Sequence, residues 1–153
     1  MGDKLSLRRH LALELAHYVQ KDILREHPLR QLFWECTLRC NVHCRHCGSD
    51  CKKVMETHDM PREDFFRVLD SIRAKIDPSQ VFVIVTGGEP FMRTDLELCG
   101  QGIRDRGFTW GMVSNGLMLT ADRFDAICKA GLSSITISLD GLCDTHDAFR
   151  KRQ

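Results

Sequence analysis

The stretch VFVIVTGGEP, at positions 81–90, decides the fold class of this chain. Residues 81–85 are β-branched or aromatic without interruption, and such a run predicts a strand buried on both faces. Gly87 and Gly88 end the strand, since adjacent glycines favour a turn over further pairing. Strands of this kind occur in parallel sheets covered by helices, so the stretch predicts an α/β fold.

Working outward from this strand, the chain repeats a strand followed by a helix. Strands are expected at 32–34, 81–85, 108–113 and 133–139, with helices at about 61–76, 93–106 and 120–130 and a short one from Asp144. The strand starts at 81, 108 and 133 give repeats of 27 and 25 residues, which fit a segment of a (βα) barrel. A doubly wound sheet is the alternative, although no G-x-G-x-x-G follows the first strand. We therefore expect about four parallel strands with outer helices in a partial barrel.

The N-terminal segment predicts a helix from about 5 to 26. Leucine, valine and isoleucine recur there every four residues, and His27-Pro28 ends the pattern. We interpret this helix as a packing element over one end of the domain, in preference to a membrane-surface helix. The expected division is a helical extension at 1–30 and the barrel segment at 31–153. The run 150–152, Arg-Lys-Arg, is interpreted as a solvated helix face.

Composition narrows the classes of function. The 153 residues are 42% hydrophobic, and 22 basic residues nearly balance 21 acidic ones. A net charge of +1 argues against coating nucleic acid or an anionic membrane, and no apolar run reaches the roughly 20 residues of a membrane helix. Eight cysteines suit either a secreted disulfide scaffold or metal chemistry in a reducing compartment. Because no export signal is evident, we expect the cytoplasm, with cysteines used for metal binding or catalysis.

The residues from Cys36 to His58 predict a long functional loop that contains Cys40-x3-Cys44-x2-Cys47. Three thiolates can bind three corners of an iron–sulfur cluster. Zinc is the alternative, because Cys51, His43 or His46 could complete a four-coordinate site. The spacing alone leaves both metals open.

The turn Thr86-Gly87-Gly88-Glu89-Pro90 predicts a ligand contact at a strand end. Adjacent glycines permit close approach of the backbone to a ligand, and the carboxylate can hold an ammonium group. A plain strand-to-helix turn is the other interpretation. Since parallel strands end at one edge of a sheet, this turn, the cysteine loop, Asn115 and Asp140 should meet there.

Together these motifs resemble the radical S-adenosylmethionine (radical SAM) enzymes. Their C-x3-C-x2-C signature after the first strand matches Cys40, Cys44 and Cys47, and their Gly-Gly-Glu-Pro matches 87–90. The strand end at 138–141, Ser-Leu-Asp-Gly, is similar to the family strand that contacts ribose and methionine. His46 departs from the aromatic residue usual before the third cysteine. The resemblance covers about residues 33–150.

The resemblance implies that the three cysteines hold a [4Fe-4S] cluster, as metal ligands, and that S-adenosylmethionine binds beside it. The turn would hold the methionyl ammonium, and His46 would lie near the adenine. The residues implied to bind this cofactor are His46, Gly87, Gly88, Glu89, Pro90, Asn115, Ser138 and Asp140. Reductive cleavage of S-adenosylmethionine would give a 5′-deoxyadenosyl radical that abstracts hydrogen from a substrate. The alternative is a non-catalytic zinc or iron–sulfur binding module.

The context of the motifs resembles the peptide-modifying and sulfatase-maturing branch, whose members carry a C-terminal SPASM or twitch domain. A peptide or protein substrate and an electron donor such as flavodoxin or ferredoxin would follow. The family barrel has about six βα units, so we expect the chain to be its N-terminal part, truncated in the fourth unit.

Overall fold

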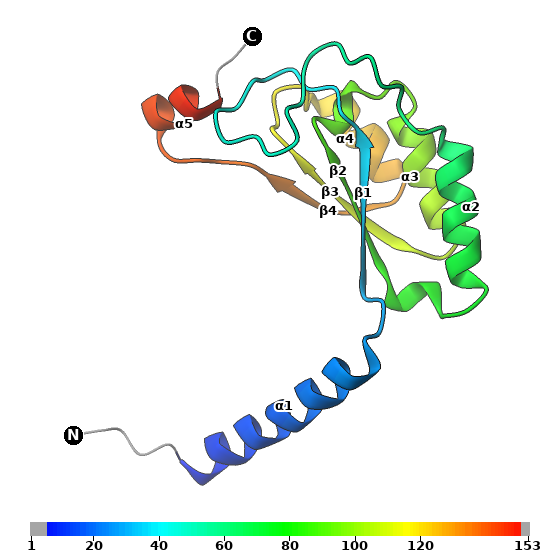
Figure 1. Cartoon of the computed structure of the whole chain (residues 1–153), viewed down its shortest axis with the longest axis vertical. Coiled ribbons are helices and arrows are strands. Elements are labelled where there is room, and N and C mark those ends of the chain that lie inside the picture. The colour runs from blue at the N-terminus through cyan, green and yellow to red at the C-terminus, as the bar shows by residue number, and fades with distance from the viewer. Residues whose placement is uncertain (1–5, 151–153) are drawn as a thin grey trace.

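The computed structural model describes residues 6–150. Its four strands form one sheet in the order β1-β2-β3-β4, and each neighbouring pair is parallel (Figure 1). The strands are β1 (Gln31–Thr37), β2 (Phe82–Gly87), β3 (Thr109–Ser114) and β4 (Leu132–Ile137). The predicted parallel α/β sheet is therefore confirmed, with each strand close to its expected position.

Three helices cover one face of the sheet: α2 (Arg62–Arg73), α3 (Leu96–Asp105) and α4 (Ala121–Lys129) (Figure 1). Residues at the helix N-termini stabilise two of them. Thr120 caps α4 by accepting a hydrogen bond from the Arg123 amide. Glu63 and Asp64 lie in the first turn of α2, where negative charge is favourable. Two short 3₁₀ turns, η1 (Pro78–Gln80) and η2 (Pro90–Met92), flank β2. The hydrophobic core between helices and sheet includes Leu69, Val83, Val85, Leu96, Ile103, Trp110 and Ile127.

The other face of the sheet is more open. Val83 and Val85 of β2 are fully buried against the helices, whereas Phe82 and Ile84 on the opposite face are half-buried. Phe33 of β1 is 62% exposed on that face. The expectation of burial on both faces is thus wrong for this chain, because no helix among the described residues covers the second face as α2–α4 cover the first.

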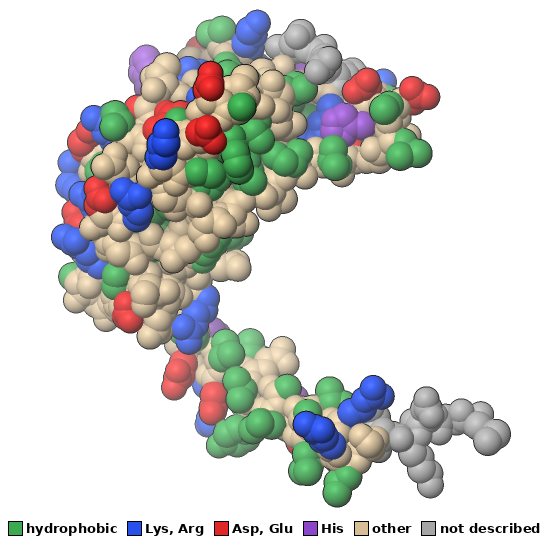
Figure 2. All heavy atoms as spheres, turned by 180° about the vertical axis from the view of Figure 1, so that it is seen from behind, with side chains coloured by type: hydrophobic (Ala, Val, Ile, Leu, Met, Phe, Trp, Pro, Cys, Tyr) green, Lys and Arg blue, Asp and Glu red, His purple; other side chains and the backbone are tan. Residues whose placement is uncertain are grey.

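The N-terminal helix α1 (Leu7–Glu26) extends away from the sheet (Figure 1). Each of its residues is exposed, so the expectation that it packs over the domain is wrong. Leu13 and Leu24 lie outside the pattern of apolar residues at every fourth position, and apolar side chains are exposed along the helix (Figure 2). His27 then adopts a left-handed conformation with φ 45°, where the chain turns towards β1. The predicted division near residue 30 stays a prediction.

Between β1 and α2 lies the cysteine loop, defined here as residues 38–61, which has no helix or strand of its own in the described structure and includes an isolated bridge between Arg39 and Lys52. This confirms the predicted long loop. The last helix, α5 (Cys143–Arg150), begins one residue before the expected Asp144. The Arg45 amide donates a hydrogen bond of 2.9 Å to the carbonyl of Phe149, so α5 lies against the cysteine loop. None of the helices in residues 6–150 is long and apolar enough to span a membrane.

Candidate functional site

The carboxyl ends of the strands border a cavity of about 170 Å³. The cysteine loop, the end of β2, the end of β3, the residue after β4 and the end of α5 all contribute to its wall. The lining residues are Cys40, Val42, Cys44, His46, Cys47, Cys51, Thr86, Gly87, Gly88, Val113, Ser114, Asn115, Ser138 and Arg150. The predicted convergence of the strand ends is thereby confirmed.

The three signature cysteines differ in their surroundings. Cys40 is buried, Cys44 is half-buried and Cys47 is exposed, although all three border the cavity. Burial raises the pKa of Cys40, whereas backbone amides, that of Cys51 first, lower the pKa of Cys47. The Cys40 amide donates to the carbonyl of Lys52 at 2.8 Å, which ties the two arms of the loop together.

These thiols suit a polynuclear cluster. A four-iron cluster needs thiolates at separate corners, and three cysteines around a common cavity supply them. The donor set therefore fits an iron–sulfur group.

Cys51 also borders this cavity. It is buried, packs with Cys40 and Val42, and burial raises the pKa of its thiol to about 12. The C-x3-C-x2-C spacing predicts that Cys51 is not a cluster ligand, and this stays a prediction.

The Gly87-Gly88 turn lies directly on the start of the cysteine loop. The Gly88 amide donates to the carbonyl of Thr37 at 2.8 Å, and the Glu89 amide donates to that of Arg39 at 2.9 Å. A Cβ on Gly87 would overlap the Thr37 carbonyl, and one on Gly88 would overlap that of Arg39. The glycines are thus needed for contact between two segments of the protein as well as for the open cavity wall.

Glu89 points into the protein and does not border the cavity. One carboxylate oxygen accepts hydrogen bonds from the Phe91 amide (3.2 Å) and the Ser114 hydroxyl (2.9 Å), and the other accepts from the Asn115 amide (2.8 Å). Burial raises its pKa despite these bonds. Pro90 is also buried and begins η2. Glu89 therefore joins the end of β2 to the end of β3, and its role towards an ammonium group stays a prediction.

The other sequence-predicted residues lie around the same edge. Asn115 borders the cavity and its amide nitrogen donates to the Asn41 side chain of the cysteine loop at 2.7 Å. The Ser138 amide donates to the carbonyl of Ser114 at 3.0 Å. Asp140 lines a neighbouring cavity with His46 and Phe149, and its carboxylate lies 3.8 Å from the His46 Nε2. His46 thus borders both cavities, whereas Asp140 is absent from the first.

Several lining residues were missed by the sequence analysis. The sequence predicts a solvated Arg150, which is wrong, because its side chain is 16% exposed, borders the cavity and pairs with the Asp140 carboxylate. This pairing lowers the pKa of Asp140. Residues 151 and 152 of the same predicted face lie outside the described residues. Ser114 was also overlooked, although it directly follows the predicted strand 108–113 and that position was a usable signal. Thr86, the first residue of the predicted turn, does border the cavity.

Known proteins are similar to this chain in sequence and in fold. Residues 34–153 match the model of the Radical SAM superfamily. An Fe-coproporphyrin III synthase of Methanosarcina barkeri is 30% identical over 117 residues, which are 76% of this chain and 29% of that protein. A pre-heme d1 synthase of Dinoroseobacter shibae is 28% identical over 141 residues, which are 92% of this chain and 34% of that protein.

The fold has solved counterparts. The structure of Streptococcus suis SuiB bound to its precursor peptide SuiA superposes with a TM-score of 0.67 at 15% identity, over 100% of this chain and 34% of that one. The chain spans about a third of the length of these relatives. The matches confirm the predicted family, while the SPASM or twitch branch stays a prediction. With its signature thiols and glycine turn on one cavity and the family model matched over most of its length, the chain belongs to the radical SAM superfamily.

Proposed function

We propose that this protein is a radical SAM enzyme whose [4Fe-4S] cluster and S-adenosylmethionine lie in the cavity at the strand ends. The observation that carries the proposal is that the three signature thiols and the Gly87-Gly88 turn border the same cavity. When bound, a reduced cluster of this kind supplies the electron that cleaves S-adenosylmethionine to a 5′-deoxyadenosyl radical, which abstracts hydrogen from a substrate.

The residues of the chain have separate roles in this proposal. Cys40, Cys44 and Cys47 hold the cluster and leave one iron without a protein ligand. Gly87 and Gly88 present backbone alone to the cofactor, which permits close approach.

Residues at the cavity and next to it complete the cofactor site. The Glu89 charge lies behind the glycine turn, where it favours the methionyl ammonium, and Pro90 fixes that turn. His46 lies near the adenine. Asn115, Ser138 and Asp140 contact the ribose hydroxyls or the methionyl carboxylate.

The assay that tests the proposal is formation of 5′-deoxyadenosine by the anaerobically reconstituted full-length protein, with dithionite as reductant. We expect turnover in the wild type and in Cys128→Ala, which removes an exposed thiol of α4. Cys47→Ala should abolish it. Equal product from Cys47→Ala and wild type would exclude the proposed ligand set, and no product from iron-loaded wild type would exclude the activity.

Two classes of substrate are suggested by the relatives. The peptide or protein expected from the sequence is supported by SuiB, which was solved with a precursor peptide. The relatives named for coproporphyrin and heme d1 synthesis are 30% and 28% identical to this chain, against 15% for SuiB. We therefore favour a tetrapyrrole substrate. Conversion of a tetrapyrrole, followed by mass spectrometry, together with 5′-deoxyadenosine formation would support this choice, and conversion of a peptide alone would reverse it.

The proposed reaction also needs an electron donor. A low-potential one-electron carrier such as flavodoxin or ferredoxin fits this need. The eight cysteines of the chain are all free thiols in the structure, and a reducing compartment such as the cytoplasm would keep them available as ligands.

A further inference from the structure

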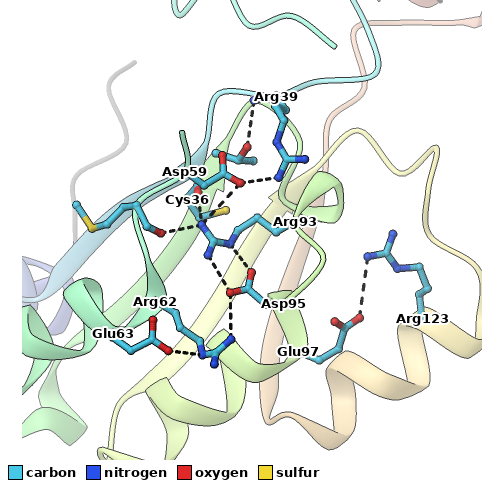
Figure 3. A network of polar contacts seen from close by, with 11 residues as sticks. Cys36, Arg39, Asp59, Arg62, Glu63, Arg93, Asp95, Glu97 and Arg123 are labelled. Carbon is cyan, nitrogen blue, oxygen red and sulfur yellow. Dashed lines mark hydrogen bonds and ion pairs between the residues drawn. The ribbon is translucent and has the colours of Figure 1, made fainter. Parts of the chain in front are cut away.

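Arg93 is the buried residue at the centre of a network of polar contacts (Figure 3). It follows η2, three residues after the Gly-Gly-Glu-Pro turn, and its side chain is only 4% exposed. A buried guanidinium is costly unless its donors are satisfied, so its partners should indicate its role.

The guanidinium contacts three separate segments. Its Nε and one terminal nitrogen donate to the two oxygens of Asp95 at 2.9 and 3.1 Å. The other terminal nitrogen, Nη1, donates to the carbonyls of Cys36 at 2.7 Å and Met60 at 3.1 Å. The Asp95 carboxylate thus holds the fork in place while Nη1 bridges two carbonyls 24 positions apart.

Those carbonyls mark the base of the cysteine loop. Cys36 is in β1 just before the loop, and Met60 is near its end, just before α2. A second contact lies above the first, because Arg39 pairs with Asp59 at 2.5 Å, and the same Asp59 oxygen lies 4.0 Å from Nη1 of Arg93 (Figure 3). The two arms of the loop are therefore held together at two successive levels.

We propose that Arg93 is a positioning residue for the cysteine loop, closing its base so that the three signature thiols keep their places at the cavity wall. This inference rests on the proposed function for its consequence, since those thiols are the proposed cluster ligands. The segment after the Gly-Gly-Glu-Pro turn would then help to form the cluster site without contacting the cluster.

The chemistry requires arginine. A planar guanidinium can bind a carboxylate with two donors and still direct a third nitrogen at two carbonyls. The lysine ammonium has three donors at one point and cannot span these partners. Arg93→Lys therefore keeps the buried charge and most of the volume while opening the base of the loop.

The test is amide hydrogen exchange of the full chain without cluster, read separately for the loop, residues 38–61, and for β2 and β3. Arg93→Lys should speed exchange in the loop by about tenfold or more and leave the two strands unchanged, because only the local opening energy falls. Arg106→Lys is the matched control. Arg106 also contacts a carboxylate (Asp70), a carbonyl (Gly102) and an aromatic ring (Phe66), but between α2 and α3.

A second variant guards against simple unfolding. Asp59→Asn removes the negative charge that the loop contributes to the network and leaves no cavity in the core. It should speed amide exchange in the loop in the same way. Unchanged loop exchange in both variants would overturn the inference, as would equal acceleration in the loop and the strands. Because no cofactor is present in this measurement, its result is independent of the 5′-deoxyadenosine assay.

Discussion

Glu89 shows how much the role of a single residue depends on the direction of its side chain. The sequence predicts that its carboxylate holds an ammonium group of the cofactor, whereas the structure surrounds it with hydrogen-bond donors from η2, the end of β3 and the residue after β3. A carboxylate that accepts three such bonds orders the turn carrying Gly87 and Gly88. Its charge can still act on a ligand across the turn, but its direct contacts are with the protein.

We predict that Glu89→Gln lowers stability in a pH-dependent manner. The side-chain NH₂ of the glutamine would face one of the hydrogen-bond donors around position 89 and leave it without an acceptor. This should lower the free energy of unfolding by roughly 1–3 kcal/mol. Burial raises the pKa of Glu89, so the native state binds more protons than the unfolded state just above the ordinary carboxyl pKa. The wild type therefore loses part of its stability as pH rises through this window, and the variant does not. Urea unfolding from about pH 4 to pH 8 measures the difference.

The stability difference between wild type and Glu89→Gln should thus be largest at the acid end and should shrink towards the raised pKa. Glu63→Gln, which removes an exposed carboxylate of α2, controls for the loss of one negative charge. A difference that stays constant over the whole range would contradict the pKa argument.

Cys47 and Cys51 provide a second test at the residue scale. Both border the cavity, yet only Cys47 belongs to the C-x3-C-x2-C spacing. We expect Cys47→Ala to abolish the cluster absorbance near ~400 nm after reconstitution, since a missing thiolate opens a second iron. Cys51→Ala should retain the absorbance. The opposite pattern would make Cys51 the third ligand.

At the scale of elements, the site depends on contact between the turn after β2 and the cysteine loop. The turn donates two backbone hydrogen bonds to the carbonyls of Thr37 and Arg39, and Arg93 reaches the base of the loop from the segment that follows. The two signature motifs are therefore packed against each other, and the position of each depends on the other. Their contact leaves no room for a side chain at Gly88.

Gly88→Ala should therefore disturb the cluster site. The new Cβ would overlap the Arg39 carbonyl and lie 3.1 Å from the Cβ of Cys40, so the loop must move at a cost of about 1–3 kcal/mol. We expect reduced iron content per chain after reconstitution, measured by elemental analysis. Gly48→Ala, in the same loop, has open space around its Cβ and should load iron normally. Equal iron in both variants would refute the packing argument.

At the scale of the whole molecule, the described chain has a core on one face of its sheet and an exposed helix at one end. The main cluster of buried apolar residues lies between the sheet and α2–α4, and a smaller one lies in the cysteine loop, while α1 contributes to neither. Burial of apolar surface is the main favourable term in folding. The stability of the sheet domain should therefore be independent of α1.

Deletion of residues 1–28 tests this independence. We predict that the unfolding free energy changes by less than about 0.5 kcal/mol, the range of surface changes, while helical ellipticity falls. Leu69→Ala, at a fully buried position of α2, should cost about 2–5 kcal/mol by leaving a cavity. Chemical unfolding of both proteins decides the point. A deletion as costly as Leu69→Ala would mean that α1 contributes to the core.

The order of strands and helices, the parallel sheet and the two motifs of the site can be predicted from the amino-acid sequence. Those features follow from patterns of neighbouring residues: the β-branched run at 81–85, the glycines that end it and the spacing of Cys40, Cys44 and Cys47. A strand end is also a local feature, so convergence of these motifs on one edge followed from the parallel order alone.

The contacts between residues far apart in the sequence become visible in the folded chain. Glu89 meets Ser114, 25 positions away, and Arg93 meets Cys36, 57 positions away. Arg150 lies at the cavity because α5 turns back onto the cysteine loop, and α1 is exposed because none of the described elements packs over it. A local pattern specifies which face of an element is apolar or charged, but the neighbour that satisfies that face is set by the packing of the whole chain.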